Sequence, residues 1–150
     1  MLGLLTHSPA DVLRYLLVDH GIGTYPDNPK SDWMIYADNE PDRLDKCITI
    51  YNTFGKPLGR SHVDSEFIEM HGIQVRIRAS VSSVAFTKAR VIAIDLDEST
   101  GREVIDIDTS SYCVHSFSRT GGIIPLGKES PTSKRSIYVF NGLLTLRQIS

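Results

Sequence analysis

The feature that most constrains the fold is a strict alternation of apolar and polar residues over positions 73–79. A period of two is typical of a β-strand, in which successive side chains point to opposite faces of the sheet. Odd positions are apolar and even positions are polar: Ile73, Val75, Ile77 and Ala79 against Gln74, Arg76 and Arg78. We therefore expect a sheet with one buried face and one polar face.

Two helices are predicted around this strand. Ser8 is a suitable N-cap, Pro9 fits the first turn, and Gly21 ends a leucine-rich run. Ser82 or Ser83 can cap a second helix, which ends near residues 99–101. The residues that recur at helical spacing are Val84, Ala85, Lys88, Ala89, Ile92 and Leu96. The apolar stripe within this set should pack on the apolar face of strand 73–79.

The remaining apolar runs are short and have strand character. We expect strands in residues 33–36, 47–52, 103–108, 112–118, 123–127 and 136–146. Pro125 indicates that its segment is either an edge strand or not a true strand, because proline cannot donate to a ladder. The last run is apolar on both faces, so it is either central or covered by a partner. Turns join most strand pairs, which predicts an α+β fold with a mainly antiparallel sheet and two main helices on one face.

Composition narrows the class of protein. The 150 residues suit one structural domain over residues 1–150, and 41% hydrophobic content supports a core. A net charge of −2 lacks the basic surface that nucleic acids and anionic membranes require. No apolar run is long enough to span a membrane. Cys47 and Cys113 lie in strand-like runs, so both are expected to be buried and reduced.

Catalytic and cofactor motifs are weak in this chain. Gly21-Ile22-Gly23 follows a helix rather than a strand, which is the wrong setting for a dinucleotide. The five histidines are scattered and form no zinc pair. Two pairs of aspartates, Asp95 with Asp97 and Asp106 with Asp108, could hold a metal ion only beside a nucleotide site, and the sequence has no nucleotide motif. Ser61, His62 and Asp64 are the residue types of a hydrolase triad, but they are adjacent in a polar loop, whereas triad residues converge from separate elements. We expect a non-enzymatic protein without a cofactor or metal.

Two surface features are candidate contact regions. Residues 53–66 contain two glycines and a proline, and a loop of this length in a compact domain is often functional. We expect this loop to reach a neighbouring protein through Lys56, Leu58, Arg60, His62 and Asp64.

The second feature is a separation of charge between residues 95–108 and residues 119–135. The candidate acidic residues are Asp95, Asp97, Glu98, Asp106 and Asp108. The candidate basic residues are Arg119, Lys128, Lys134 and Arg135. Opposite patches can pair head-to-tail between copies, and such contacts close into rings when the rotation permits. Alternatively, the acidic stretch faces a lumen, or both patches are simply solvated.

The chain also resembles the small minor capsid proteins of long-tailed bacteriophages that are grouped with tail terminators. The likeness spans most of the chain, with little from residues 80–112. It rests on the order of these segments: Thr6-His7-Ser8-Pro9-Ala10-Asp11, Gly21-Ile22-Gly23, Trp33…Tyr36…Glu40-Pro41-Asp42, Ile48-Thr49-Ile50-Tyr51, Gly59-Arg60-Ser61, residues 71–78, Ser118-Arg119-Thr120-Gly121-Gly122-Ile123, Gly127, Ser130-Pro131-Thr132 and Arg135.

The resemblance implies a virion protein at the head-proximal end of the tail, present in the host cytoplasm during assembly. Such proteins form a ring, usually hexameric, that caps the tail tube and joins it to the head–tail connector. DNA passes through the lumen without specific binding. The implied fold is α+β, no membrane or cofactor is involved, and there are no catalytic residues to carry over.

Three other functions remain open. A head-completion or neck protein of the connector would use the same fold logic. A small enzyme with a dispersed site would show a deep pocket of convergent polar groups. A nucleic-acid-binding module is disfavoured by the charge balance and by an aromatic content of 8%.

Overall fold

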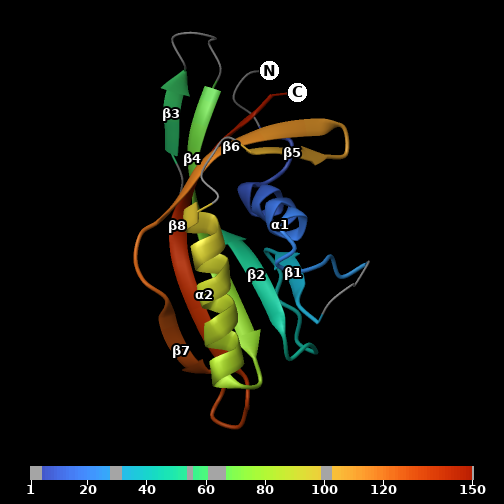
Figure 1. Ribbon diagram of the computed structural model, residues 1–150, viewed down its shortest axis with the longest axis vertical. Helices are drawn as coiled ribbons and strands as arrows, with labels where there is room; N and C mark the ends of the chain where they lie inside the picture. The colour runs from blue at the N-terminus through green and yellow to red at the C-terminus, as the bar shows by residue number, and fades with distance from the viewer. Residues whose placement is uncertain (1–4, 28–31, 54–55, 61–66, 99–102, 150) are drawn as a thin grey trace.

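The computed structural model describes residues 5–27, 32–53, 56–60, 67–98 and 103–149. The chain forms two helices and a mixed, curled β-sheet, an α+β arrangement (Figure 1). The helices are α1 (Pro9–Asp19) and α2 (Ser82–Glu98). The strands are β1 (Met34–Ala37), β2 (Cys47–Asn52), β3 (Lys56–Arg60), β4 (Phe67–Ala79), β5 (Glu103–Ile107), β6 (Ser110–Arg119), β7 (Ile124–Lys128) and β8 (Ser136–Gln148).

The sheet is built around two long strands, β4 and β8, of 13 residues each. They pair antiparallel from Glu69 opposite Leu146 to Ala79 opposite Ser136. The strand order is β1-β2-β4-β8-β6-β5, while β3 pairs with β4 and β7 pairs with β8. β1 and β2 are parallel, and the other described pairs are antiparallel. The central position of β8 explains why it is apolar on both faces.

Both helices contribute to one apolar cluster on the same face of the sheet. Ile73, Val75 and Ile77 of β4 are fully buried in that cluster, as the alternation predicted. The predicted stripe of α2 packs there through Ala85, Ala89, Ile92 and Leu96. In Figure 1, α2 lies along β4 and β8, whereas α1 lies beside β2 and beneath the curled end formed by β5 and β6.

The ends of α1 follow from local sequence. The Ser8 hydroxyl accepts a hydrogen bond from the Asp11 amide at 3.2 Å, and Pro9 occupies the first turn. Gly21 has a φ of +74°, a left-handed conformation that glycine adopts without a Cβ penalty. The predicted caps of this helix are therefore confirmed.

The predicted loop over residues 53–66 is wrong in part. Residues Lys56–Arg60 form β3, which pairs with β4 between Phe67 and Met70. Proline and glycine in this run concealed the strand, but both are tolerated here because β3 is an edge strand with a register shift between Pro57 and Gly59. Lys56, Leu58 and Arg60 thus lie on a strand, whereas His62 and Asp64 lie outside the described residues.

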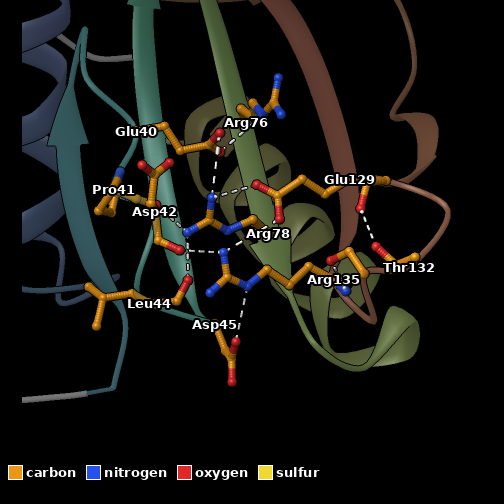
Figure 2. A network of polar contacts seen from close by, with 12 residues as sticks. Glu40, Pro41, Asp42, Leu44, Asp45, Arg76, Arg78, Glu129, Thr132 and Arg135 are labelled. Atoms are coloured by element: carbon orange, nitrogen blue, oxygen red, sulfur yellow. Dashed lines mark hydrogen bonds and ion pairs between the residues drawn. The ribbon is translucent and has the colours of Figure 1, made fainter.

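At the end of β4 that carries Arg78, the face of the sheet opposite the helices is covered rather than open to solvent. Arg78 of β4 is fully buried there, beneath the segment 38–46 and the turn between β7 and β8 (Figure 2). One guanidinium nitrogen donates to Glu129 Oε1 at 3.2 Å, and the other donates to the carbonyls of Leu44, at 2.5 Å, and Pro41. The predicted polar face is therefore polar at Arg78, and the structure adds that this end of it is buried.

Candidate assembly surface

The contact residues predicted from sequence do not form one site. Lys56, Leu58 and Arg60 lie in the β3–β4 hairpin, which projects at one end of the long axis (Figure 1). At the base of this hairpin, His71 Nε2 and Glu69 Oε2 lie 2.7 Å apart. The hairpin is thus a two-stranded arm rather than a loop, remote from α2 in the view of Figure 1.

Most of the acidic candidates have partners within the chain. Asp95 Oδ2 lies 2.7 Å from His20 Nδ1, and Asp97 Oδ2 lies 2.9 Å from a guanidinium nitrogen of Arg119. Asp106 accepts a hydrogen bond from the Ser111 hydroxyl at 2.5 Å, yet it remains exposed. Asp108 lies 3.6 Å from His7 Nε2 and its side chain is 81% exposed. Glu98 is exposed at the end of α2.

The basic candidates divide in the same way. Arg135 donates to Asp45 Oδ1 at 3.1 Å and to the Asp42 carbonyl at 2.5 Å, so it fixes the β7–β8 turn to the segment after β1. Arg119 pairs with Asp97. Lys128 and Lys134 are exposed and have no ion pair with any described residue. The predicted attraction between the two charged stretches therefore operates partly inside one copy, through Asp97 and Arg119.

Helix α2 is apolar on more of its surface than its contact with the sheet requires. Its outer side exposes Phe86 at 40%, Val91 at 44% and Ile94 at 42%. A helix that is apolar on several sides is usually covered, either by the rest of its domain or by a partner. Because these residues are exposed in the isolated chain, α2 is the strongest candidate for a surface that is buried on assembly.

One groove runs along α2 beside the turn between β6 and β7. Its volume is about 350 Å³, and Phe86, Arg90 and Ile94 of the helix line it together with Arg119 and Ile123. The Phe86 ring also packs edge-on against Tyr138, with ring centroids 5.6 Å apart. The groove therefore combines apolar side chains with two arginines, of which Arg119 pairs with Asp97, whereas Arg90 is exposed and has no ion pair with a described residue.

A larger cleft lies between α1 and β5. Its volume is about 530 Å³, and it is lined by Tyr15, Val18, Asp19, Tyr25, Val104, Ile105 and Asp106. Both charges in its lining are negative. Burial raises the pKa of Tyr25, so its phenol stays neutral at physiological pH. The cleft therefore combines apolar and aromatic walls with two carboxylates.

A third hollow of about 300 Å³ lies on the other side of α2, between the helix and Trp33. Lys88 lines it, donates to the Ile22 carbonyl at 2.6 Å and lies 5.4 Å from the centre of the Trp33 ring. Burial lowers the pKa of Lys88. This lysine connects α2 to the loop after α1, which accounts for its position without a ligand.

The described histidine, cysteine, aspartate and glutamate side chains are not arranged as a metal-binding site. Among the described residues, no group of three or more histidine, cysteine, aspartate or glutamate side chains is placed to hold a metal ion. The two acidic pairs do not converge, because Asp95 faces His20 and Asp106 faces Ser111. Cys47 and Cys113 are free and buried, as predicted, and burial raises the pKa of Cys47 to about 11.

The sequence analysis did not identify three residues that line the groove and the cleft: Arg90, Asp19 and Tyr25. Arg90 was not singled out, although Phe86, Arg90 and Ile94 recur every four residues and could have been seen as a second stripe on α2. Asp19 and Tyr25 gave no signal, because they face Asp106 only after β5 has folded over α1. Their proximity depends on tertiary structure.

Comparison with known proteins adds no assignment. No known protein family and no curated protein sequence matches this chain. No helix in the described part is long and apolar enough to cross a membrane.

Proposed function

We propose that this protein is a tail terminator of a long-tailed bacteriophage. In this role, several copies form a ring, with six as the expected number, that caps the completed tail tube and joins it to the head–tail connector. DNA passes through the lumen, and no catalytic step or cofactor is needed. The protein would then act in the virion at the head-proximal end of the tail.

The observation that carries this proposal is the exposed apolar side of α2, which supports burial against another subunit. Phe86, Val91 and Ile94 stay exposed, whereas the apolar residues on the inner side of the helix are buried: Ala85, Ala89, Ile92, Ala93 and Leu96. The α+β arrangement is compatible with the fold that the sequence resemblance implies. The resemblance itself supplies the position in the virion, which surface physics alone does not specify.

The β3–β4 hairpin is the proposed arm toward the tube or the next subunit. It consists of an edge strand and the first part of β4, and it projects beyond the helices (Figure 1). Among the described strands, β4 is the one that pairs with β3, so the loss of β3 should leave the apolar cluster under the helices intact.

Electron microscopy of purified tail tubes that lack this protein tests the proposal. Addition of the protein should place a ring at one tube end, and mass measurement should give a defined oligomer there. A variant with residues 56–64 replaced by a short turn should stay folded and fail to cap. Tubes that stay bare with the intact protein would contradict the proposal, and normal capping by the variant would remove the hairpin from it.

A further inference from the structure

The outer side of α2 carries a linear ridge. Phe86, Arg90 and Ile94 are spaced by four residues, so their side chains form one row along the helix. All three are exposed, whereas Ala85, Ala89 and Ile92 on the inner side are fully buried. The ridge thus presents an aromatic ring, a positive charge and an aliphatic side chain in a fixed order. We call these three residues the α2 ridge.

The cleft between α1 and β5 has complementary properties. Asp19 and Asp106 supply its charge, and Tyr15, Tyr25 and Val104 supply apolar and aromatic surface. Val104 is 54% exposed, although it is a β-branched residue in a strand. Arg14 of the same chain already lies over the Tyr25 ring, 5.1 Å from its centre. The two carboxylates are therefore the partners that the cleft offers to a second guanidinium group, which pairs well with carboxylates. We call this hollow the α1–β5 cleft.

The ridge and the cleft lie on opposite flanks of the molecule. In Figure 1, α1 and β5 lie at the right, whereas the connection from β6 to β7, beside which the ridge runs, lies at the left. Two complementary surfaces so placed do not meet within one copy. They can meet between successive copies, and repetition of such a contact gives a ring or a filament.

Sheet extension between copies is a less suitable contact on this flank. β7 is an exposed edge strand, but Pro125 lacks an amide donor and the register shifts between Pro125 and Gly127. Proline, bulges and an edge lysine such as Lys128 all protect a strand from pairing with another chain. A contact through side chains, rather than through strand hydrogen bonds, fits these features.

We propose that the α2 ridge of one copy inserts into the α1–β5 cleft of the next, with Arg90 between Asp19 and Asp106. The proposal rests on the assembly role given above and names the two surfaces that would build the ring. It selects Asp106 from the acidic residues predicted by sequence, because that residue lines the cleft and remains exposed. It assigns the main basic role to Arg90 rather than to Arg135, because Arg135 already donates hydrogen bonds to Asp45 and to the Asp42 carbonyl of its own chain.

Charge reversal tests the contact in the full chain. Arg90→Glu and Asp106→Arg should each weaken self-association by about tenfold or more, because like charges would then face each other. The double variant should recover much of the loss, since every copy carries both exchanged charges. Arg43→Glu is the matched control, as it makes the same change of charge on an exposed arginine that belongs to neither charged stretch. Sedimentation and mass photometry give the association, and circular dichroism checks folding.

Intermolecular cross-linking keeps the test decisive if the isolated protein is mostly monomeric. A mixture of Arg90→Cys and Asp106→Cys copies should form a mixed disulfide about tenfold faster than a mixture of Arg43→Cys and Asp106→Cys copies. The native Cys47 and Cys113 are buried, so they should not compete. Equal cross-linking rates, together with unchanged association of the single reversals, would overturn the proposal.

The outcome is separable from that of the proposed function. If the double variant restores self-association but the protein never binds tube ends, the ridge–cleft contact stands and the tail role fails. If the protein caps tubes while both single reversals cap equally well, the tail role stands and the ridge–cleft contact fails.

Discussion

The two faces of the sheet both bury side chains of β4, but one face buries apolar groups and the other buries a charged group. Ile77 and Arg78 are neighbours in β4, point to opposite faces and are both fully buried. Ile77 lies among aliphatic side chains beneath the helices. Arg78 lies beneath irregular chain, held by carbonyls and carboxylates (Figure 2). At this end of the sheet, one face is thus covered by secondary structure and the other by loops fixed to an arginine.

The two kinds of burial differ in how strictly they depend on the direction of each contact. Apolar burial depends on area and packing, so several side chains can share the work and tolerate small changes. A buried guanidinium group needs specific partners, because an unpaired buried charge is very costly. Glu129 bonds both Arg78, at 3.2 Å, and Arg135, at 3.4 Å, and so joins the β7–β8 turn to the sheet. Arg76 adds a second contact, with its Nε 3.0 Å from Glu40 Oε1.

The largest effect is expected from Arg78→Ala. The change leaves the carbonyls of Pro41 and Leu44 without their donor and removes one partner from Glu129. We expect a loss of about 3–5 kcal/mol in the free energy of unfolding, typical of breaking a buried ion pair. Urea denaturation measures it, with Arg135→Ala as a more exposed control that should cost less. A loss below about 1 kcal/mol would show that the loops do not depend on Arg78.

A smaller effect is expected from Ile77→Val, the neighbouring position on the helix-covered face. It removes one buried methylene group beneath the helices and leaves no polar group unpaired. The expected loss is about 0.5–1.5 kcal/mol, measured under the same denaturation conditions. A loss equal to that of Arg78→Ala would refute the contrast between tolerant and directional burial.

The smallest effect concerns a polar contact at the rim of the helix-covered face. His20 Nδ1 lies 2.7 Å from Asp95 Oδ2 and its Nε2 lies 2.6 Å from Glu103 Oε1, so the ring connects α1, α2 and β5. Burial lowers the pKa of His20, but the two hydrogen bonds and carboxylate charges outweigh it, and the pKa is raised above 6.5. The charged form is therefore favoured by folding.

This stabilisation should be fully present below about pH 6.5 and should fade as the pH rises through the folded-state pKa. Between pH 6 and 9, the unfolding free energy should decrease by a modest amount, and His20→Gln should make the profile flatter over that window. Chemical denaturation at fixed pH steps provides the measurement. An identical slope for both proteins would mean that His20 does not carry the dependence.

Several parts of this fold follow from local sequence. The caps of α1, the alternation in β4 and the β-branched run of β2 each predict their element, because capping, period and propensity act over a few residues. The strand β3 was missed for the same reason, since Lys56-Pro57-Leu58-Gly59-Arg60 has no local preference for a strand. It is a strand because β4 extends far enough to offer it a partner.

The candidate assembly surface was predictable only in part. Charge separation between residues 95–108 and 119–135 drew attention to Asp106 and Arg119, which the structure places at the α1–β5 cleft and beside the α2 ridge. Several of these charges, Arg119 among them, have partners within the chain: Asp95 with His20, Asp97 with Arg119, and Arg135 with Asp45. A count of charges along a sequence does not reveal which of them are already paired.

The sequence by itself determined where most helices and strands begin, which residues of β4 face the core, and that both cysteines would be buried. Tertiary structure alone decided that Arg78 is covered, that β3 pairs with β4, and that Asp19 and Asp106 share one cleft. The physical reason is the distance along the chain over which each interaction acts. Capping, periodicity and propensity act between near neighbours, whereas burial and pairing depend on segments that meet only when the sheet has closed and curled.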